Sequence, residues 1–177
     1  MATPGRVNKD MTGEALLLSV ALLLLAVAPI ARAADCTQPA ASGVDWQRCS
    51  LDRRDLAGQD LSGARLTDAS FERADLHGAD LSGVKAVHAK FISASLGKAR
   101  LDNGNFAEAD FTKADLSGAS LKDADLRRAR FFRANLRGAD LSGARTDGAD
   151  LLNADLSGAR WSDGRRICAE GSTGQCE

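Results

Sequence analysis

The residues of this chain best suited to bind a partner lie in one arginine-rich stretch, LRRARFFRANLRG at 126–138. The stretch contains five arginines and two phenylalanines and no acidic residue. Guanidinium groups bind carboxylates and phosphates, and exposed apolar side chains beside them favour protein contacts. We therefore consider a partner-binding strip for a protein or an anionic polymer, made of Arg127, Arg128, Arg130, Phe132, Arg133 and Arg137.

Catalytic chemistry finds little support in the sequence. The chain has two histidines, His77 and His88, and it contains no nucleophile elbow, P-loop, zinc-protease or dinucleotide fingerprint. Serine and aspartate recur in repeated GADLSG elements, which points to a structural role. We expect a non-catalytic protein without a cofactor or a metal site.

A five-residue period decides how these side chains are positioned. From Val44 to Asp163 the chain forms 24 pentapeptides, whose central residue is Leu 15 times, Phe five times and Trp twice. Only Ala86 and Thr146 depart from this rule. A helix would scatter these residues around its axis, because five residues turn about 500°. Short strands separated by turns instead put the central residue and the small residue two places earlier on one side.

The phenylalanines indicate how many pentapeptides make one coil. Phe71, Phe91, Phe111 and Phe131 recur at every fourth pentapeptide, so four pentapeptides form a square coil and six coils form a solenoid. Coils stack at the strand spacing of about 4.8 Å, which places one phenylalanine on the next. A tube this narrow has room for one large side chain per side, so the second inward residue is small, mostly Ala.

The repeat A-(D/N/S/R)-(L/F)-x-x resembles the pentapeptide repeat family. The resemblance implies an all-β fold, a right-handed quadrilateral parallel β-helix of about six coils, over residues 44–163. It says little about function, although some members resemble duplex DNA and bind type II topoisomerases. The flanks, VDWQRCSLDRRDLAG at 44–58 and WSDGRRICAEGSTGQC at 161–176, look like those of small exported members.

The N-terminus has the pattern of a secretory signal peptide over residues 1–33. Arg6 and Lys9 precede the apolar run LLLSVALLLLAVA at 16–28, and Ala31-Arg32-Ala33 forms a cleavage site. The run is shorter than the roughly 20 residues that span a bilayer, and an uncleaved anchor is the alternative. Residues 34–43 are expected to form an N-terminal cap segment, and residues 164–177 a C-terminal disulfide cap.

Four cysteines, an even number in an exported chain, suggest disulfides. They are Cys36, Cys49, Cys168 and Cys176. Three pairings are possible, and the two local ones are favoured because each brackets one end of the repeat. A zinc site is the alternative, but the spacings fit no zinc finger.

Outward residues one coil apart should form columns along the solenoid. On the phenylalanine side, Lys90, Asp110, Arg130 and Asp150 alternate in sign and predict a ladder of exposed ion pairs. Two further columns on that side hold Ile92, Phe132 and Leu152, and Arg53, Arg73, Lys113 and Arg133. The alternative to a binding strip is an ordinary surface whose arginines are neutralised by Asp110, Asp125, Asp147 and Asp150.

The next side carries aspartates that Ser95 and Asn135 interrupt. Carboxylates in a column can collect calcium, but no calcium-loop spacing is present. Aspartates in such positions more often accept hydrogen bonds from nearby turn N–H groups, and we expect that here.

These features favour a periplasmic or secreted, non-catalytic structural or protein-interaction module. The net charge of −1 produces no overall electrostatic attraction to nucleic acid. Contact with a membrane is expected only through the signal peptide, before it is cleaved. A topoisomerase-binding DNA mimic is one alternative, disfavoured by the export signal and the mixed charge. A cell-wall glycan binder or enzyme is another, and the oligomeric state stays open.

Overall fold

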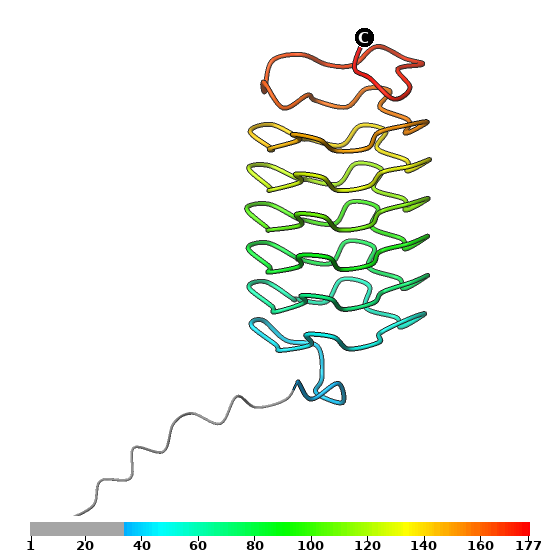
Figure 1. The fold of residues 1–177 in the computed structure, drawn as a ribbon. Coiled ribbons are helices and arrows are strands. Elements are labelled where there is room, and N and C mark those ends of the chain that lie inside the picture. The colour runs from blue at the N-terminus through cyan, green and yellow to red at the C-terminus, as the bar shows by residue number, and fades with distance from the viewer. Residues whose placement is uncertain (1–33) are drawn as a thin grey trace, which may run out of the picture. The chain divides into compact units, whose positions relative to one another are not determined.

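The structure, a computed structural model, describes residues 34–177, so the predicted signal peptide over residues 1–33 lies outside the described part. Figure 1 shows this part as a stack of similar coils that rises along one axis to the C-terminus. Its strands are single-residue bridges rather than extended elements. Within residues 34–177 no helix is long and apolar enough to cross a bilayer.

Each coil consists of four pentapeptides, as the phenylalanine spacing predicts. Parallel bridges join each outward strand residue to its counterpart four pentapeptides on, from Asp45 with Arg65 to Asp140 with Arg160. Every coil therefore has four walls, one pentapeptide to a wall. Wall 1 holds the central residues at 46, 66, 86, 106, 126 and 146, and walls 2, 3 and 4 hold those of the three pentapeptides that follow each of these.

Each wall ends in a tight turn that makes the corner. The carbonyl of the central residue accepts a hydrogen bond from the N–H three residues on, as in Cys49 N to Trp46 O at 3.1 Å. We call the two residues between them the first and second turn positions. The second turn position has a positive φ, for example +65° at Gly58 and +57° at Arg73. This is the geometry of a type II turn, in which glycine is favoured.

The core is a single file of buried side chains inside the four walls. The central phenylalanines of wall 2 stack at centroid distances of 5.1, 4.9 and 5.0 Å, with interplanar angles of 6° or less. The predicted aromatic ladder is thus confirmed. The alanines two residues before the central residues are buried beside it, because a larger side chain would not fit there.

One exchange of size between neighbouring coils explains why Ala86 departs from the rule. In that coil the inward pair is Val84 and Ala86, and in the next coil it is Gly104 and Phe106, all of them buried. A Cβ on Gly104 would overlap the Phe106 ring. The Phe106 ring occupies the space where a methyl group on residue 104 would lie. The large and small inward residues are therefore exchanged between the two coils.

The two ends are closed in different ways. At the N-terminal end Cys36 is joined to Cys49, and Trp46 is fully buried, with 0% of its surface exposed, which fits an apolar lid. Arg54 and Gln59, which replace alanine in the first coil, are exposed.

At the C-terminal end the chain folds back on the last coil. Asp155 pairs with Thr173 and Arg160 with Ile167 in antiparallel bridges, and Cys168 is joined to Cys176. Both disulfides are the local pairs that the sequence favours. The antiparallel return covers the edge of walls 3 and 4, and sequence periodicity gave no sign of it because the segment does not repeat.

The size exchange predicts a pair of linked substitutions. Gly104→Ala should destabilise the protein by about 1–3 kcal/mol, because its methyl group overlaps the Phe106 ring. Adding Phe106→Leu should recover much of that loss, because leucine is the usual central residue and fits beside alanine. Urea unfolding of the two single variants and the double variant measures the coupling. Additive losses would contradict the shared volume.

Candidate interaction surface

The predicted strip does not form one flat face. Arg127 and Arg128 occupy the turn of wall 1, and Arg130 follows on the strand of wall 2. Phe132 and Arg133 lie in the turn of wall 2, and the last member, Arg137, lies in the turn of wall 3. Because consecutive turns form different corners of the coil, the six side chains wrap around three walls. The structure therefore places Arg137 apart from the others.

Carboxylates neutralise the arginines on wall 1. Arg127 Nη2 lies 2.6 Å from Asp125 Oδ2, and its hydrogen bond lowers the pKa of the Asp125 carboxyl and raises that of the guanidinium. Arg128 Nη1 lies 3.7 Å from Glu108 Oε1. Glu108 stands one full coil, or 20 residues, before Arg128 in the same column. Pairing residues 20 positions apart on wall 1 would therefore have identified this partner from the sequence.

Arg130 on wall 2 and Arg137 on wall 3 are paired as well. Arg130 forms an ion pair with Asp110, and Arg137 lies 3.2 Å from Asp155 Oδ2 and 2.8 Å from Glu170 Oε1. These contacts, that with Glu170 first, raise the pKa of the Arg137 guanidinium. Glu170 belongs to the C-terminal return, which has no repeat, so no sequence signal pointed to it.

Asp110 is the most enclosed acid of this region. Burial raises the pKa of its carboxyl, but hydrogen bonds from Thr112 and Arg130 outweigh that effect and hold it below its ordinary value. The ion-pair ladder predicted along this column is confirmed only for Asp110 with Arg130. Among the described residues Lys90 and Asp150 have no ion pair, and Asp150 Oδ1 instead accepts the Leu152 N–H at 3.0 Å.

Arg133 differs from the other members of the strip. Its guanidinium carbon stands 5.1 Å from the centroid of the Phe132 ring, in a cation–π contact. No carboxylate within residues 34–177 lies at ion-pair distance from it. Arg133 is therefore the one arginine of the strip whose charge is available to a partner.

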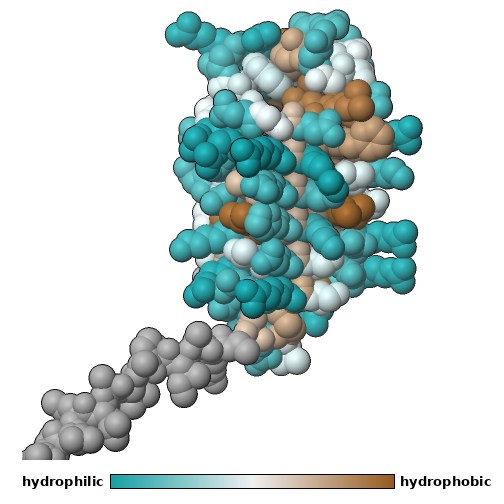
Figure 2. Space-filling model, in the orientation of Figure 1, coloured by the Kyte–Doolittle hydropathy of each residue, from teal (hydrophilic) through white to brown (hydrophobic). Residues whose placement is uncertain are grey.

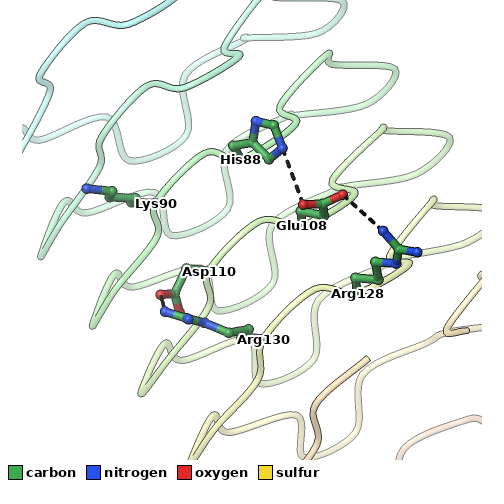
Figure 3. A pocket seen from close by; sticks show the side chains of 6 residues that line it. All are labelled: His88, Lys90, Glu108, Asp110, Arg128 and Arg130. Carbon is green, nitrogen blue, oxygen red and sulfur yellow. Dashed lines mark hydrogen bonds and ion pairs between the residues drawn. The ribbon is translucent and has the colours of Figure 1, made fainter. Parts of the chain in front are cut away.

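A shallow pocket lies between the turns of wall 1 and the strands of wall 2. Its lining is His88, Lys90, Glu108, Asp110, Arg128 and Arg130. Figure 3 shows them as two parallel rows, with Glu108 between His88 and Arg128. The lining contains no serine, threonine or cysteine, and its charged groups largely pair with one another.

The two histidines lie on different walls. His77 lies in the turn of wall 3 and His88 in the turn of wall 1. His88 is held between two carboxylates, with Nδ1 3.3 Å from Asp68 and Nε2 3.4 Å from Glu108. Across the described part of the chain no group of three His, Cys, Asp or Glu residues is arranged to hold a metal ion.

The aspartates of the strand positions satisfy a particular backbone donor. Ladder and turn bonds use every N–H of a pentapeptide except that of the first turn position. The Asp or Asn two residues earlier accepts it, as in His77 N to Asp75 Oδ1 at 3.0 Å. This confirms the expected turn contact and explains why the repeat prefers Asp or Asn there.

Hydrophobic side chains are sparse on the visible surface and gather near its C-terminal end, as Figure 2 shows. Two large hydrophobic side chains of the described residues are clearly exposed, Leu152 at 61% and Ile167 at 49%. Leu152 stands one coil above Phe132 in the same column. The apolar part of the strip therefore continues toward that end of the rod.

The comparisons with known proteins identify the family. The model of pentapeptide repeats matches residues 49–85, 89–128 and 129–160 in eight copies. The chain therefore belongs to the pentapeptide repeat family, and its fold is the right-handed quadrilateral β-helix of that family. No protein with a curated description matches the chain in sequence.

Several solved structures are similar. HetL, a pentapeptide repeat protein involved in heterocyst differentiation regulation in Nostoc sp. strain PCC 7120, is 33% identical over 69% of this chain and 63% of its own, with a TM-score of 0.44. QnrB1, a plasmid-mediated fluoroquinolone resistance protein, is 25% identical over 73% of this chain and 68% of its own, with a TM-score of 0.55. A pentapeptide repeat protein from the Arabidopsis thaliana thylakoid lumen is 28% identical over 69% and 83%, with a TM-score of 0.32. The chain thus spans less than two thirds of HetL.

The aspartate contacts predict a difference between two substitutions at one position. Asp75→Ala should cost about 1 kcal/mol of unfolding free energy, because the His77 N–H loses its acceptor. Asp75→Asn should cost much less, because its amide oxygen can accept the same bond. Asp75 forms no ion pair among the described residues, so charge does not confuse the comparison. Equal losses in urea unfolding would contradict the assigned role.

Proposed function

We propose that the protein is an exported, non-catalytic module that binds a partner protein through walls 1 and 2 of its C-terminal half. The observation that carries the proposal is the contact of Arg133 with Phe132. This unpaired cation stands beside exposed Leu152, on a surface where the neighbouring arginines are neutralised. Rigid columns of this kind present a partner with fixed charges at little cost in side-chain ordering.

Two features support export. The N-terminal apolar run has the composition of a cleavable leader, and disulfides close both ends of the described rod. Disulfides persist in oxidising compartments. We accordingly assign residues 1–33 to the leader, 34–43 to the N-terminal cap, 44–163 to the β-helix and 164–177 to the C-terminal cap.

The similarity to the fluoroquinolone resistance protein QnrB1 supports a second candidate, binding of a type II topoisomerase in the cytoplasm as a DNA mimic. A DNA mimic needs runs of negative charge. Here lysine and arginine interrupt the strand columns of walls 1 and 4, at Arg65, Lys85, Arg100, Arg145 and Arg160. The mixed columns favour the first candidate.

Cell fractionation combined with crosslinked capture tests the proposal. The protein should be recovered from the periplasm or the medium without residues 1–33. Capture of its crosslinked partner should fall at least tenfold in the double variant Arg130→Glu, Phe132→Ser. Lys98→Glu, a charge reversal on wall 3, is the matched control and should leave capture unchanged.

Three results would contradict the proposal. Uncleaved protein in the cytoplasm would remove export and favour the topoisomerase candidate. Unchanged capture by the double variant would show that the strip is ordinary surface. Capture of peptidoglycan in place of a protein would move the function to the glycan class.

A further inference from the structure

The second turn position is occupied by different residue types on wall 2 and on wall 3. On wall 3 this position is glycine in five of six coils, at 58, 78, 118, 138 and 158. On wall 2 it is never glycine, and its residues are Arg53, Arg73, Ser93, Lys113, Arg133 and Asn153, with φ between 56° and 61°. This left-handed conformation is unfavourable for residues with a Cβ. The fold does not need these side chains, since glycine makes the same turn one wall away.

The four basic residues of this column are also unpaired. Arg53, Arg73, Lys113 and Arg133 have no carboxylate of residues 34–177 at ion-pair distance, whereas the arginines at the strand positions are bridged, as Arg65 is to Asp45 and Arg145 to Asp125. This column thus combines four unpaired cations with a backbone conformation that costs energy for side chains larger than glycine, which makes it a candidate site for an external anion.

An apolar row runs beside the upper part of this basic column. The first turn positions of the upper four coils of wall 2 are Ile92, Thr112, Phe132 and Leu152, all partly or fully exposed. The large apolar residues of this row are two coils apart from Ile92 to Phe132 and one coil apart from Phe132 to Leu152. The last three residues of the basic column have the same spacing, from Arg73 to Lys113 and then to Arg133, one coil lower. Wall 2 therefore offers an apolar row and a basic row in parallel.

We propose that the partner contacts wall 2 with an acidic amphipathic α-helix laid along the rod axis, an inference that rests on the proposed protein-binding function. One heptad of a helix advances about 10.5 Å, close to the roughly 9.6 Å of two coils. One coil of about 4.8 Å matches residues three or four apart. A helix presents leucine and glutamate stripes side by side, whereas a strand turns alternate side chains away.

Other anions fit this surface less well. An acidic glycan or a nucleic acid strand would meet the four cations but would leave the apolar row uncovered, including Leu152, which is 61% exposed. The apolar row next to the cations thus selects a polypeptide. Salt should weaken the complex, because the basic column is exposed and screened by ions.

The test uses the mature protein and a synthetic three-heptad helical peptide with leucine on one stripe and glutamate on the adjacent stripe. Saturable binding by calorimetry is expected, together with a loss of at least tenfold in the triple variant Arg73→Glu, Lys113→Glu, Arg133→Glu. Lys98→Glu is the matched control, because Lys98 occupies the second turn position of wall 3 with a φ of 57°. It should bind as the unchanged protein does.

Three results would overturn the inference. They are absence of saturable binding, equal binding of a scrambled peptide of the same composition, and tighter binding of polygalacturonate or single-stranded DNA than of the helix. In each case the proposed function stands if the strip variant Arg130→Glu, Phe132→Ser still loses its crosslinked partner. The two ideas therefore fail separately.

Discussion

One constraint governs the molecule: the tube is so narrow that each wall of a coil holds one bulky side chain and one small one. Stacked phenylalanines about 5 Å apart fill wall 2, and alanine lies beside nearly every central residue because nothing larger fits. The exchange between Val84 with Ala86 and Gly104 with Phe106 shows the constraint at work, since the space gained in one coil is used in the next.

The surface follows from the same constraint. A fixed coil of four pentapeptides turns outward side chains into straight columns, so a charge can be neutralised from the coil below, as Asp110 neutralises Arg130. The backbone ladder leaves one N–H per pentapeptide without a backbone acceptor. The side chain of an aspartate or asparagine two residues earlier accepts the hydrogen bond from this N–H. Most polar groups of the surface thus have structural partners. Within residues 34–177 the four basic residues at the second turn position of wall 2 have no carboxylate at ion-pair distance, and they lie next to the apolar row of the same wall.

The sequence predicted the fold well because a strict period leaves few alternatives. The coil length, the phenylalanine ladder and the local disulfides came from spacing, and the aspartate contacts came from the tendency of aspartate to bond nearby turn N–H groups. The surface was predicted less well. The partner Glu108 could have been predicted, because it lies 20 residues before Arg128. Glu170 could not, because it belongs to a segment without a repeat. Which of two nearby carboxylates an arginine pairs with depends on side-chain geometry, which the spacing does not determine. For that reason the ladder from Lys90 to Asp150 reduced to one ion pair.

Cysteine crosslinking tests the four-pentapeptide coil most directly. Residues 112 and 132 are one coil apart in the same column, so their Cα atoms should be separated by about 4.8 Å, within the range of roughly 4.4–6.8 Å that a disulfide spans. Thr112→Cys with Phe132→Cys should therefore oxidise to an intramolecular disulfide, seen by mass spectrometry of the digested protein. Thr112→Cys with Arg137→Cys, a pair separated by one pentapeptide more than a full coil, should not. Crosslinking of the second pair and not the first would contradict the four-walled coil.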